Sequence, residues 1–160
     1  KAAWAEIDER VKAKAKTAAE SKAAADAKII KKAISEELEK PKGKLTKADY
    51  EKVTELNFAF VRAAGGVPLT ELPKGLEKLT QLKVLSLHNN ELTEVKNLEK
   101  LTELTELYLP GNKLTEVKSL EKLIKLEHLW LFDNPNLTKS QIDELKKALP
   151  NCDIRSNPKK

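Results

Sequence analysis

The sequence predicts an α/β solenoid, in which short coils of the chain stack along one axis. Leu82, Leu104 and Leu126 begin three similar segments at intervals of 22 residues. The connecting stretches match as well, with LTEVKNLEKLTE at 92–103 and LTEVKSLEKLIK at 114–125. Each segment also carries an asparagine at the same place: Asn90, Asn112 and Asn134. Three copies in phase indicate a repeat architecture rather than a fold with one central core.

The leucines of each segment predict a short strand with one buried face. Each segment has a pair of leucines two residues apart: Leu85 and Leu87, Leu107 and Leu109, and Leu129 and Leu131. Side chains at this spacing point to the same side of a strand. One coil cannot enclose that side alone, so stacked coils are expected to share a continuous leucine core.

This pattern resembles the leucine-rich repeats of the short 22-residue class, found in bacterial surface proteins such as the internalins. The resemblance covers about residues 45–155 and implies a right-handed solenoid whose strands line a concave face. It also implies that the three asparagines lie inside and bond backbone groups of adjacent coils. Recognition without catalysis follows as the expected role, with a location outside the cell, on its surface or in the periplasm.

The N-terminal part of the chain is expected to be helical and to have two roles. Residues 1–25 are rich in alanine and lysine, which favour a helix, and no glycine or proline precedes Pro41. Residues 26–52 are expected to cap the N-terminal end of the solenoid. Apolar residues return at helical spacing between Ile29 and Leu38, as such a cap requires.

The repeats themselves are placed at residues 53–137. A short helix over 47–52 leads into them, and it begins at Thr46 and Asp49, which have the spacing of a capping box. The first repeat is degenerate. Residues 59–68 depart from the pattern and are interpreted either as a protruding loop or as a reorganised coil beside the binding face.

Residues 138–160 are expected to form the C-terminal cap and a mobile tail. A helix there would place three apolar side chains on one face: Ile142, Leu145 and Leu149. After it, Cys152 and Ile154 are expected to form a last partial coil, with Cys152 as a small buried hydrophobe.

Charge and composition exclude some classes of function. The net charge is +5, but residues 1–45 hold 12 basic and 8 acidic residues, so only +1 of it falls on the rest of the chain. A nearly neutral solenoid argues against nucleic-acid binding, which needs clustered lysine and arginine. No apolar run of about 20 residues occurs, so a membrane-spanning segment is not expected. The absence of methionine indicates a processed form or a piece of a longer chain.

No pattern in the sequence predicts catalysis or a bound cofactor. Glycine-rich phosphate loops, paired-cysteine motifs and zinc-protease motifs are all missing. His88 and His128 are the only histidines, and they stand two strands apart with no evident third ligand. Cys152 paired with a histidine is a further candidate for catalysis, but a cysteine in the cap should lie off the concave face. The prediction is a protein that is not an enzyme and binds neither metal nor cofactor.

The candidate binding site lies on the concave face, where alternate strand residues point outward. Aromatic side chains gather there, and exposed aromatics side by side often mark contact sites. The ligand-binding candidates are Ser86, His88, Glu106, Tyr108, His128, Trp130 and Phe132. The alternative is that these rings only pack on one another and stabilise the sheet.

The sequence is compatible with two functions. The first is recognition of a protein, peptide or glycan through the concave face. The second is self-assembly, because Trp4, Ile7 and Val11 form an apolar stripe at helical spacing on a segment with no other evident role. This stripe is the candidate oligomer contact.

Overall fold

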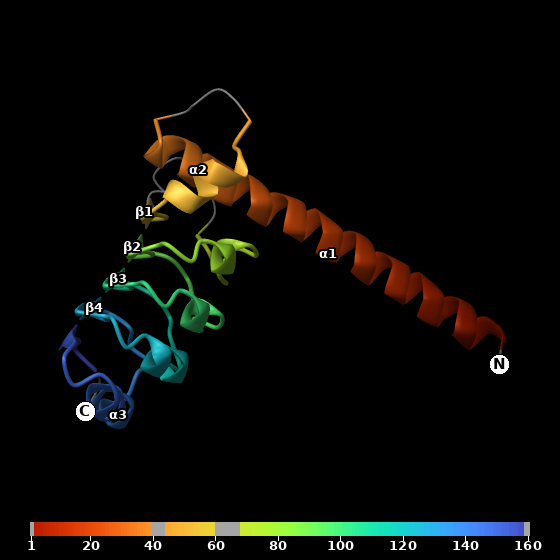
Figure 1. The fold of residues 1–160 in the computed structure, drawn as a ribbon. Coiled ribbons are helices and arrows are strands. Elements are labelled where there is room, and N and C mark those ends of the chain that lie inside the picture. The colour runs from red at the N-terminus through yellow and green to blue at the C-terminus, as the bar shows by residue number, and fades with distance from the viewer. Residues whose placement is uncertain (1, 40–43, 60–67, 159–160) are drawn as a thin grey trace.

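The strands form one parallel sheet that runs the length of the molecule. The computed structural model describes residues 2–39, 44–59 and 68–158, and its coils stack from β1 at one end to β5 at the other (Figure 1). Neighbours in the sheet are neighbours in the chain. The strands are β1 (Glu55–Asn57), β2 (Val84–Ser86), β3 (Glu106–Tyr108), β4 (His128–Trp130) and β5 (Asp153–Arg155). The predicted α/β solenoid is confirmed.

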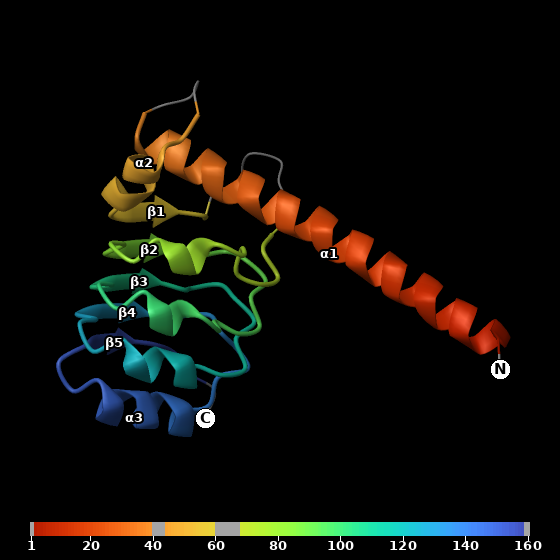
Figure 2. The ribbon, with the colours of Figure 1, turned by 45° about the vertical axis from the view of Figure 1, so that its right-hand side comes forward.

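The core is a stack of leucines held in register by the sheet. The middle residues of successive strands pair with one another and are all buried: Leu56, Leu85, Leu107, Leu129 and Ile154. On the opposite, convex side the arcs form short 3-10 helices: η1 (Leu76–Lys78), η2 (Leu98–Lys100) and η3 (Lys118–Lys122). Figure 2 shows these helices one above the other, in front of the strands. The leucines of the arcs close the core from that side.

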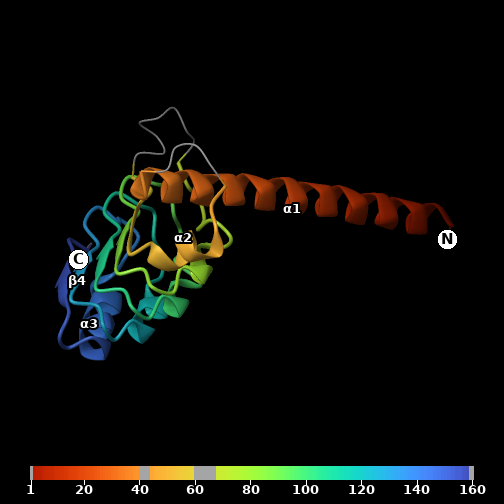
Figure 3. The same ribbon diagram turned by 45° about the horizontal axis from the view of Figure 1, so that its top comes forward.

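A long helix, α1 (Ala2–Glu37), covers the N-terminal end of the solenoid and then leaves it. Its C-terminal part buries Ile30 and Ile34 against the first coil. At about 1.5 Å per residue the helix is about 54 Å long, and its N-terminal half projects away from the coils (Figure 3). The helix runs without a break through residues 25 and 26, so the division proposed there stays a prediction. The side chains of Trp4, Ile7 and Val11 lie outside the described part of the structure.

The second helix begins where the sequence predicts. Helix α2 (Lys47–Lys52) has Thr46 as its N-cap, and the capping box is formed in both directions. The Thr46 amide donates to Asp49 Oδ2 at 2.8 Å, and the Asp49 amide donates to Thr46 Oγ1 at 3.3 Å. Residues 60–67, which include most of the segment interpreted as a loop or a reorganised coil, lie outside the described residues.

A third helix, α3 (Lys139–Ala148), closes the C-terminal end of the core. Its capping box joins Thr138 and Gln141, and its apolar face is buried as expected, with Ile142, Leu145 and Leu149 inside. The chain then forms β5, the predicted last partial coil. Cys152 is half-buried rather than buried, because it stands beside the edge strand and not under it.

The predicted mobile tail includes Asn157, which contacts a turn of the last full coil. Its side chain accepts a hydrogen bond from the Asp133 amide at 2.7 Å and donates to Asp133 Oδ1 at 3.0 Å. These two bonds replace the contact that a further coil would make with this turn. Asn157 therefore closes the series of turns at the C-terminal end of the stack.

The three repeat asparagines bond backbone groups of adjacent coils, as the resemblance implies. Asn112 Nδ2 donates to the carbonyls of Leu87 at 3.0 Å and Leu109 at 2.9 Å, while its Oδ1 accepts from the Leu92 amide at 3.1 Å. Asn90 and Asn134 make the equivalent bonds one coil earlier and one coil later. All three are buried, so their amides satisfy backbone groups that water cannot reach.

The residue before each buried asparagine has a left-handed backbone. The φ values are 58° at Asn89, 67° at Gly111 and 55° at Asp133. Glycine, asparagine and aspartate are the residues that adopt this conformation most readily. Gly111 has a second reason, because a Cβ there would lie 2.5 Å from Asn89 Oδ1 of the preceding turn. These turns direct each asparagine side chain inward.

We expect Asn112→Ala to lower the free energy of unfolding by at least about 2 kcal/mol, because it leaves the Leu92 amide without its acceptor and removes one of the two asparagine donors from each of the Leu87 and Leu109 carbonyls. Urea denaturation followed by circular dichroism measures the effect. Asn136→Ala is the control, since Asn136 is exposed and makes one long bond, to the Lys113 carbonyl at 3.5 Å. Equal stability of the two variants would contradict the role given to the buried amide.

Candidate binding surface

The concave face is a grid of side chains from the strands and the residues that follow them. The first row is Glu55, Val84, Glu106, His128 and Asp153, and the second row is Asn57, Ser86, Tyr108, Trp130 and Arg155. The third row is Ala59, His88, Pro110 and Phe132, just past the ends of the strands. Parallel pairing in register, with strands about 4.8 Å apart, places members of a row directly beside one another.

The central feature of the second row is a stacked pair of aromatic rings. The ring centroids of Tyr108 and Trp130 lie 4.2 Å apart, and their planes differ by 4°. Stacking follows from the register, because the strand spacing is close to the preferred separation of two parallel rings. Both side chains are half-buried, so they support each other and still present surface to solvent.

Tyr108 is held from its hydroxyl end by a carboxylate. Its hydroxyl donates to Glu106 Oε2 at 2.6 Å. This hydrogen bond is the main reason that the pKa of Tyr108 is raised above 10.0, with desolvation and the charges of Glu106 and Glu55 adding to it. The tyrosine ring is thus fixed on one face by Trp130 and at its hydroxyl by Glu106.

His128 lies beside Trp130 with its ring tilted. The centroids are 5.5 Å apart and the planes differ by 35°. Its Nδ1 is 4.0 Å from Asp153 Oδ2, within the range of an ion pair if the ring is protonated but too far for a hydrogen bond. This nitrogen is buried and has no hydrogen-bond partner among the described residues.

The fifth strand adds two charged residues that the sequence interpretation did not place on this face. Arg155 Nε donates to Asp153 Oδ2 at 2.8 Å, and Arg155 stands beside Trp130 in the second row. The 22-residue period could not find them, because Ile154 follows Leu129 by 25 residues. The helix α3 takes the place of the usual arc and lengthens the coil. Alternation of charged and apolar residues around Ile154 was the available signal.

The third row borders an open groove. Phe132 is 36% exposed, while His88 contributes to a groove of about 720 Å³ that runs over the turns between Ala59 and Pro135. Its lining is mostly backbone turns and exposed polar side chains, among them Asn89, Glu91, Lys113 and Asp133. The groove extends the concave face beyond the strands. Of the seven predicted site residues, the sheet brings together His128, Trp130, Tyr108, Glu106 and Ser86, with Phe132 and His88 at the border.

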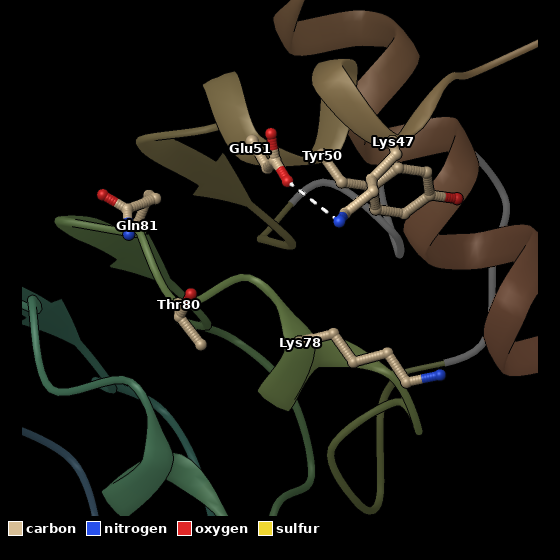
Figure 4. Close-up of a pocket in the computed structure, with 6 residues that line it drawn as sticks. All are labelled: Lys47, Tyr50, Glu51, Lys78, Thr80 and Gln81. Carbon is tan, nitrogen blue, oxygen red and sulfur yellow. Dashed lines mark ion pairs between the residues drawn. The ribbon is translucent and has the colours of Figure 1, made fainter.

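A second hollow lies on the other side of the molecule. It has a volume of about 640 Å³ and lies between α2 and η1, where Figure 4 shows Lys47, Tyr50, Glu51, Lys78, Thr80 and Gln81 around it. The ion pair that crosses part of it, Lys47 to Glu51 at 3.7 Å, is exposed and contributes little. Its lining includes none of the residues of the concave rows, and we assign it no role.

The thiol of Cys152 is unsuited to act as a nucleophile. Partial burial, together with the negative charge of Asp153, raises its pKa to about 11. Since the thiolate is the reactive form, the thiol is almost wholly protonated at neutral pH. Within the described ranges there is also no group of three or more histidine, cysteine or acidic side chains that could hold a metal ion, and no helix has the length and apolar character needed to cross a bilayer.

Comparison with known proteins agrees with the repeat pattern. Residues 102–147 match the family described as leucine-rich repeats, in two copies. The fold of the solenoid is that of leucine-rich repeats. A search of curated protein sequences found no significant match.

Solved structures of bacterial proteins share this fold. Two Listeria monocytogenes proteins resemble the chain: the internalin inlF (22% identity, TM-score 0.60, 82% of this chain and 44% of that one) and internalin C2 (23%, 0.62, 80% and 54%). A leucine-rich-repeat protein of Leptospira interrogans is 36% identical over 54% of this chain and 22% of its own, with a TM-score of 0.50. The predicted resemblance to internalin-like leucine-rich-repeat proteins is confirmed. The chain spans about a fifth to about a half of these relatives.

The bond between Tyr108 and Glu106 makes the sheet face sensitive to high pH. A phenol whose folded pKa is raised contributes stability that is fully present below its ordinary pKa of 10.0 and is lost as pH rises through the folded value. We expect Glu106→Ala to lower the Tyr108 pKa towards 10.0, because the acceptor and its charge are removed. Carbon-13 NMR titration of the two tyrosines measures it, with Tyr50 as the internal control. An unchanged Tyr108 pKa would contradict this hydrogen bond.

Proposed function

We propose that this leucine-rich-repeat domain recognises a protein or peptide, without catalysis, through the concave face. The observation that carries the proposal is the second row, in which tyrosine, tryptophan and arginine occupy adjacent strands at Tyr108, Trp130 and Arg155. These three residue types are the ones most enriched among residues that dominate binding energy at interfaces. Phe132 adds exposed aromatic surface beside them.

The arrangement of the rings supports contact with a partner more than packing alone. Tyr108 and Trp130 stack face to face and are fixed before any partner arrives. A rigid aromatic surface loses little conformational entropy on binding. Packing alone would not require Phe132 to remain 36% exposed at the border of the same face.

The size of the face limits the ligand. Five strands with four spacings of about 4.8 Å make a surface about 20 Å across, whereas a standard interface needs about 800 Å² from each partner. A peptide, a short helix or a glycan fits this width, and a larger protein would need additional contacts from the groove or from α1. We also propose that the protein works outside the cell, on its surface or in the periplasm, as its internalin-like resemblance implies.

The decisive variant is Trp130→Ala. Random linear peptides displayed on phage are selected on the intact protein, and the affinity of the selected peptides is measured by surface plasmon resonance. Loss of a central aromatic should cost about 2 kcal/mol or more, which is roughly 30-fold in Kd. The far-ultraviolet spectrum should be unchanged, because Trp130 is not part of the leucine core.

Ile124→Ala is the matched control. Ile124 is a large apolar residue, 79% exposed, and it lies on the arc side of its coil rather than on a strand. This variant should bind the selected peptides within twofold of the intact protein. Unchanged affinity in Trp130→Ala together with a lower melting temperature would show that the rings serve packing alone.

A second candidate function is self-assembly through α1. The observation that favours it is the N-terminal half of this helix, which extends beyond the solenoid (Figure 3). An isolated helix gains no stability from an apolar stripe. Contact of this half with another subunit would bury Trp4, Ile7 and Val11 and give the stripe a role. In this proposal the helix of one copy packs on its neighbour.

Deletion of residues 1–25 tests the assembly. We expect the intact protein to increase in mass with concentration in light scattering, and the shortened protein to remain monomeric. Trp4→Ala with Ile7→Ala should repeat the effect of the deletion, since it removes two of the three side chains of the stripe, each of which supplies about 1.5–3 kcal/mol when buried. If both proteins are monomers at every concentration, the assembly hypothesis is refuted.

A further inference from the structure

The fixed charges of the concave face are unevenly distributed. At the β5 end, Asp153 and Arg155 neutralise each other through the 2.8 Å bond. At the β1 to β3 end, Glu55 and Glu106 have no cationic partner among the described residues, and Glu106 accepts only the Tyr108 hydroxyl. Uncompensated negative charge therefore collects around Tyr108.

Two side chains shorter than glutamate lie on β2 between these two carboxylates. Val84 stands between Glu55 and Glu106 in the first row, and Ser86 stands between Asn57 and Tyr108 in the second. The strands β1 and β3 lie two strand spacings, about 9.6 Å, apart. The side chains on these two strands are longer than those on β2 between them. We name this place the β2 notch, with Val84 and Ser86 as its floor.

One wall of the β2 notch is an aromatic face. Trp130 of β4 stacks on one side of the Tyr108 ring, and the two ring centroids lie 4.2 Å apart. The direction from one ring to the other is the direction from β3 to β4. The other side of the ring therefore faces β2, where its register partner is Ser86. A serine side chain ends at its Oγ and is too short to cover the ring.

The chemistry of the notch selects a flat cation. A guanidinium group stacks on an aromatic face, and its planar set of donors can reach two carboxylates at once. Glu106 Oε2 is used by Tyr108, while its Oε1 and both oxygens of Glu55 have no hydrogen-bond donor within the described chain. An ammonium group would satisfy the charge but could not stack, so lysine fits less well.

We propose that the β2 notch receives an arginine side chain of the partner segment, which stacks on Tyr108 and donates hydrogen bonds to Glu106 and Glu55. This inference rests on the proposed function, and it makes the preferred ligand a basic peptide. The remaining aromatic surface, Trp130 and Phe132, then contacts the apolar part of that peptide.

The test uses a capped glycine/serine peptide with one arginine and the same peptide with citrulline, which has the shape of arginine without its charge. Nitrogen-15 NMR titration of the intact protein gives the Kd from the amide shifts of Ser86 and Tyr108. The arginine peptide should bind at least tenfold more tightly than the citrulline peptide. A lysine peptide should fall between them, and the preference should weaken with added salt.

Variants assign the effect to the notch. Glu55→Gln combined with Glu106→Gln should abolish the preference for arginine over citrulline; the glutamine carbonyl can still accept the Tyr108 hydroxyl, so the ring stays in place. Ser86→Leu should abolish it by filling the notch. Glu116→Gln is the matched control and should keep the preference, since Glu116 is exposed on another part of the coil and lies near α3.

Two results would overturn the inference. Equal affinity for the arginine and citrulline peptides refutes it, and the proposed function survives if peptides selected on phage still depend on Trp130. If that dependence is absent as well, both proposals are refuted. A mass that rises with concentration in the protein alone, and that the glutamine variants remove, would assign the notch to a second copy of the chain instead.

Discussion

The buried asparagine amides hold the coils of this solenoid together in a way that leucine packing cannot. A leucine core is non-directional and tolerates sliding of one coil over the next. The side-chain amide of Asn112 makes directional bonds. Its Nδ2 donates to the Leu87 and Leu109 carbonyls of two successive coils, and its Oδ1 accepts a hydrogen bond from the Leu92 backbone amide. The Leu87 carbonyl receives both Asn90 and Asn112, each at 3.0 Å. Neighbouring asparagines thus share acceptors and fix the spacing and register of the stack.

The binding surface is a consequence of this register. Because each strand pairs residue for residue with the next, a side chain type placed once per coil becomes a row on the concave face. Tyr108 and Trp130 stack because their positions are 22 residues apart in the chain and one strand apart in space. The same rule puts Glu55, Val84 and Glu106 in one row and creates the β2 notch. Specificity can therefore change one coil at a time without disturbing the core.

The two ends of the stack are closed by different means. At the C-terminal end α3 covers the core, and Asn157 takes the place of the missing next turn. At the N-terminal end Ile30 and Ile34, about one turn of α1 apart, are buried against the core, and Ile29, Ala33 and Leu38 pack beside them. The rest of α1 is longer than capping needs. This excess length is the part of the fold that a recognition role does not explain, and it motivates the assembly hypothesis.

The sequence by itself determined the repeat, its core leucines and the Thr46 capping box, because these depend on spacing within one coil or one helix turn. The inward position of the asparagines was implied by the resemblance to leucine-rich repeats. It also predicted outward-facing residues on β2, β3 and β4, since alternation along a strand is a local property. Only the tertiary structure decided that Asp153 and Arg155 join this face, because α3 breaks the period before β5. The pairing of Tyr108 with Glu106, and of Asp153 with Arg155, also needed it. Side-chain partners depend on rotamers and neighbouring charges, which spacing in the sequence does not specify.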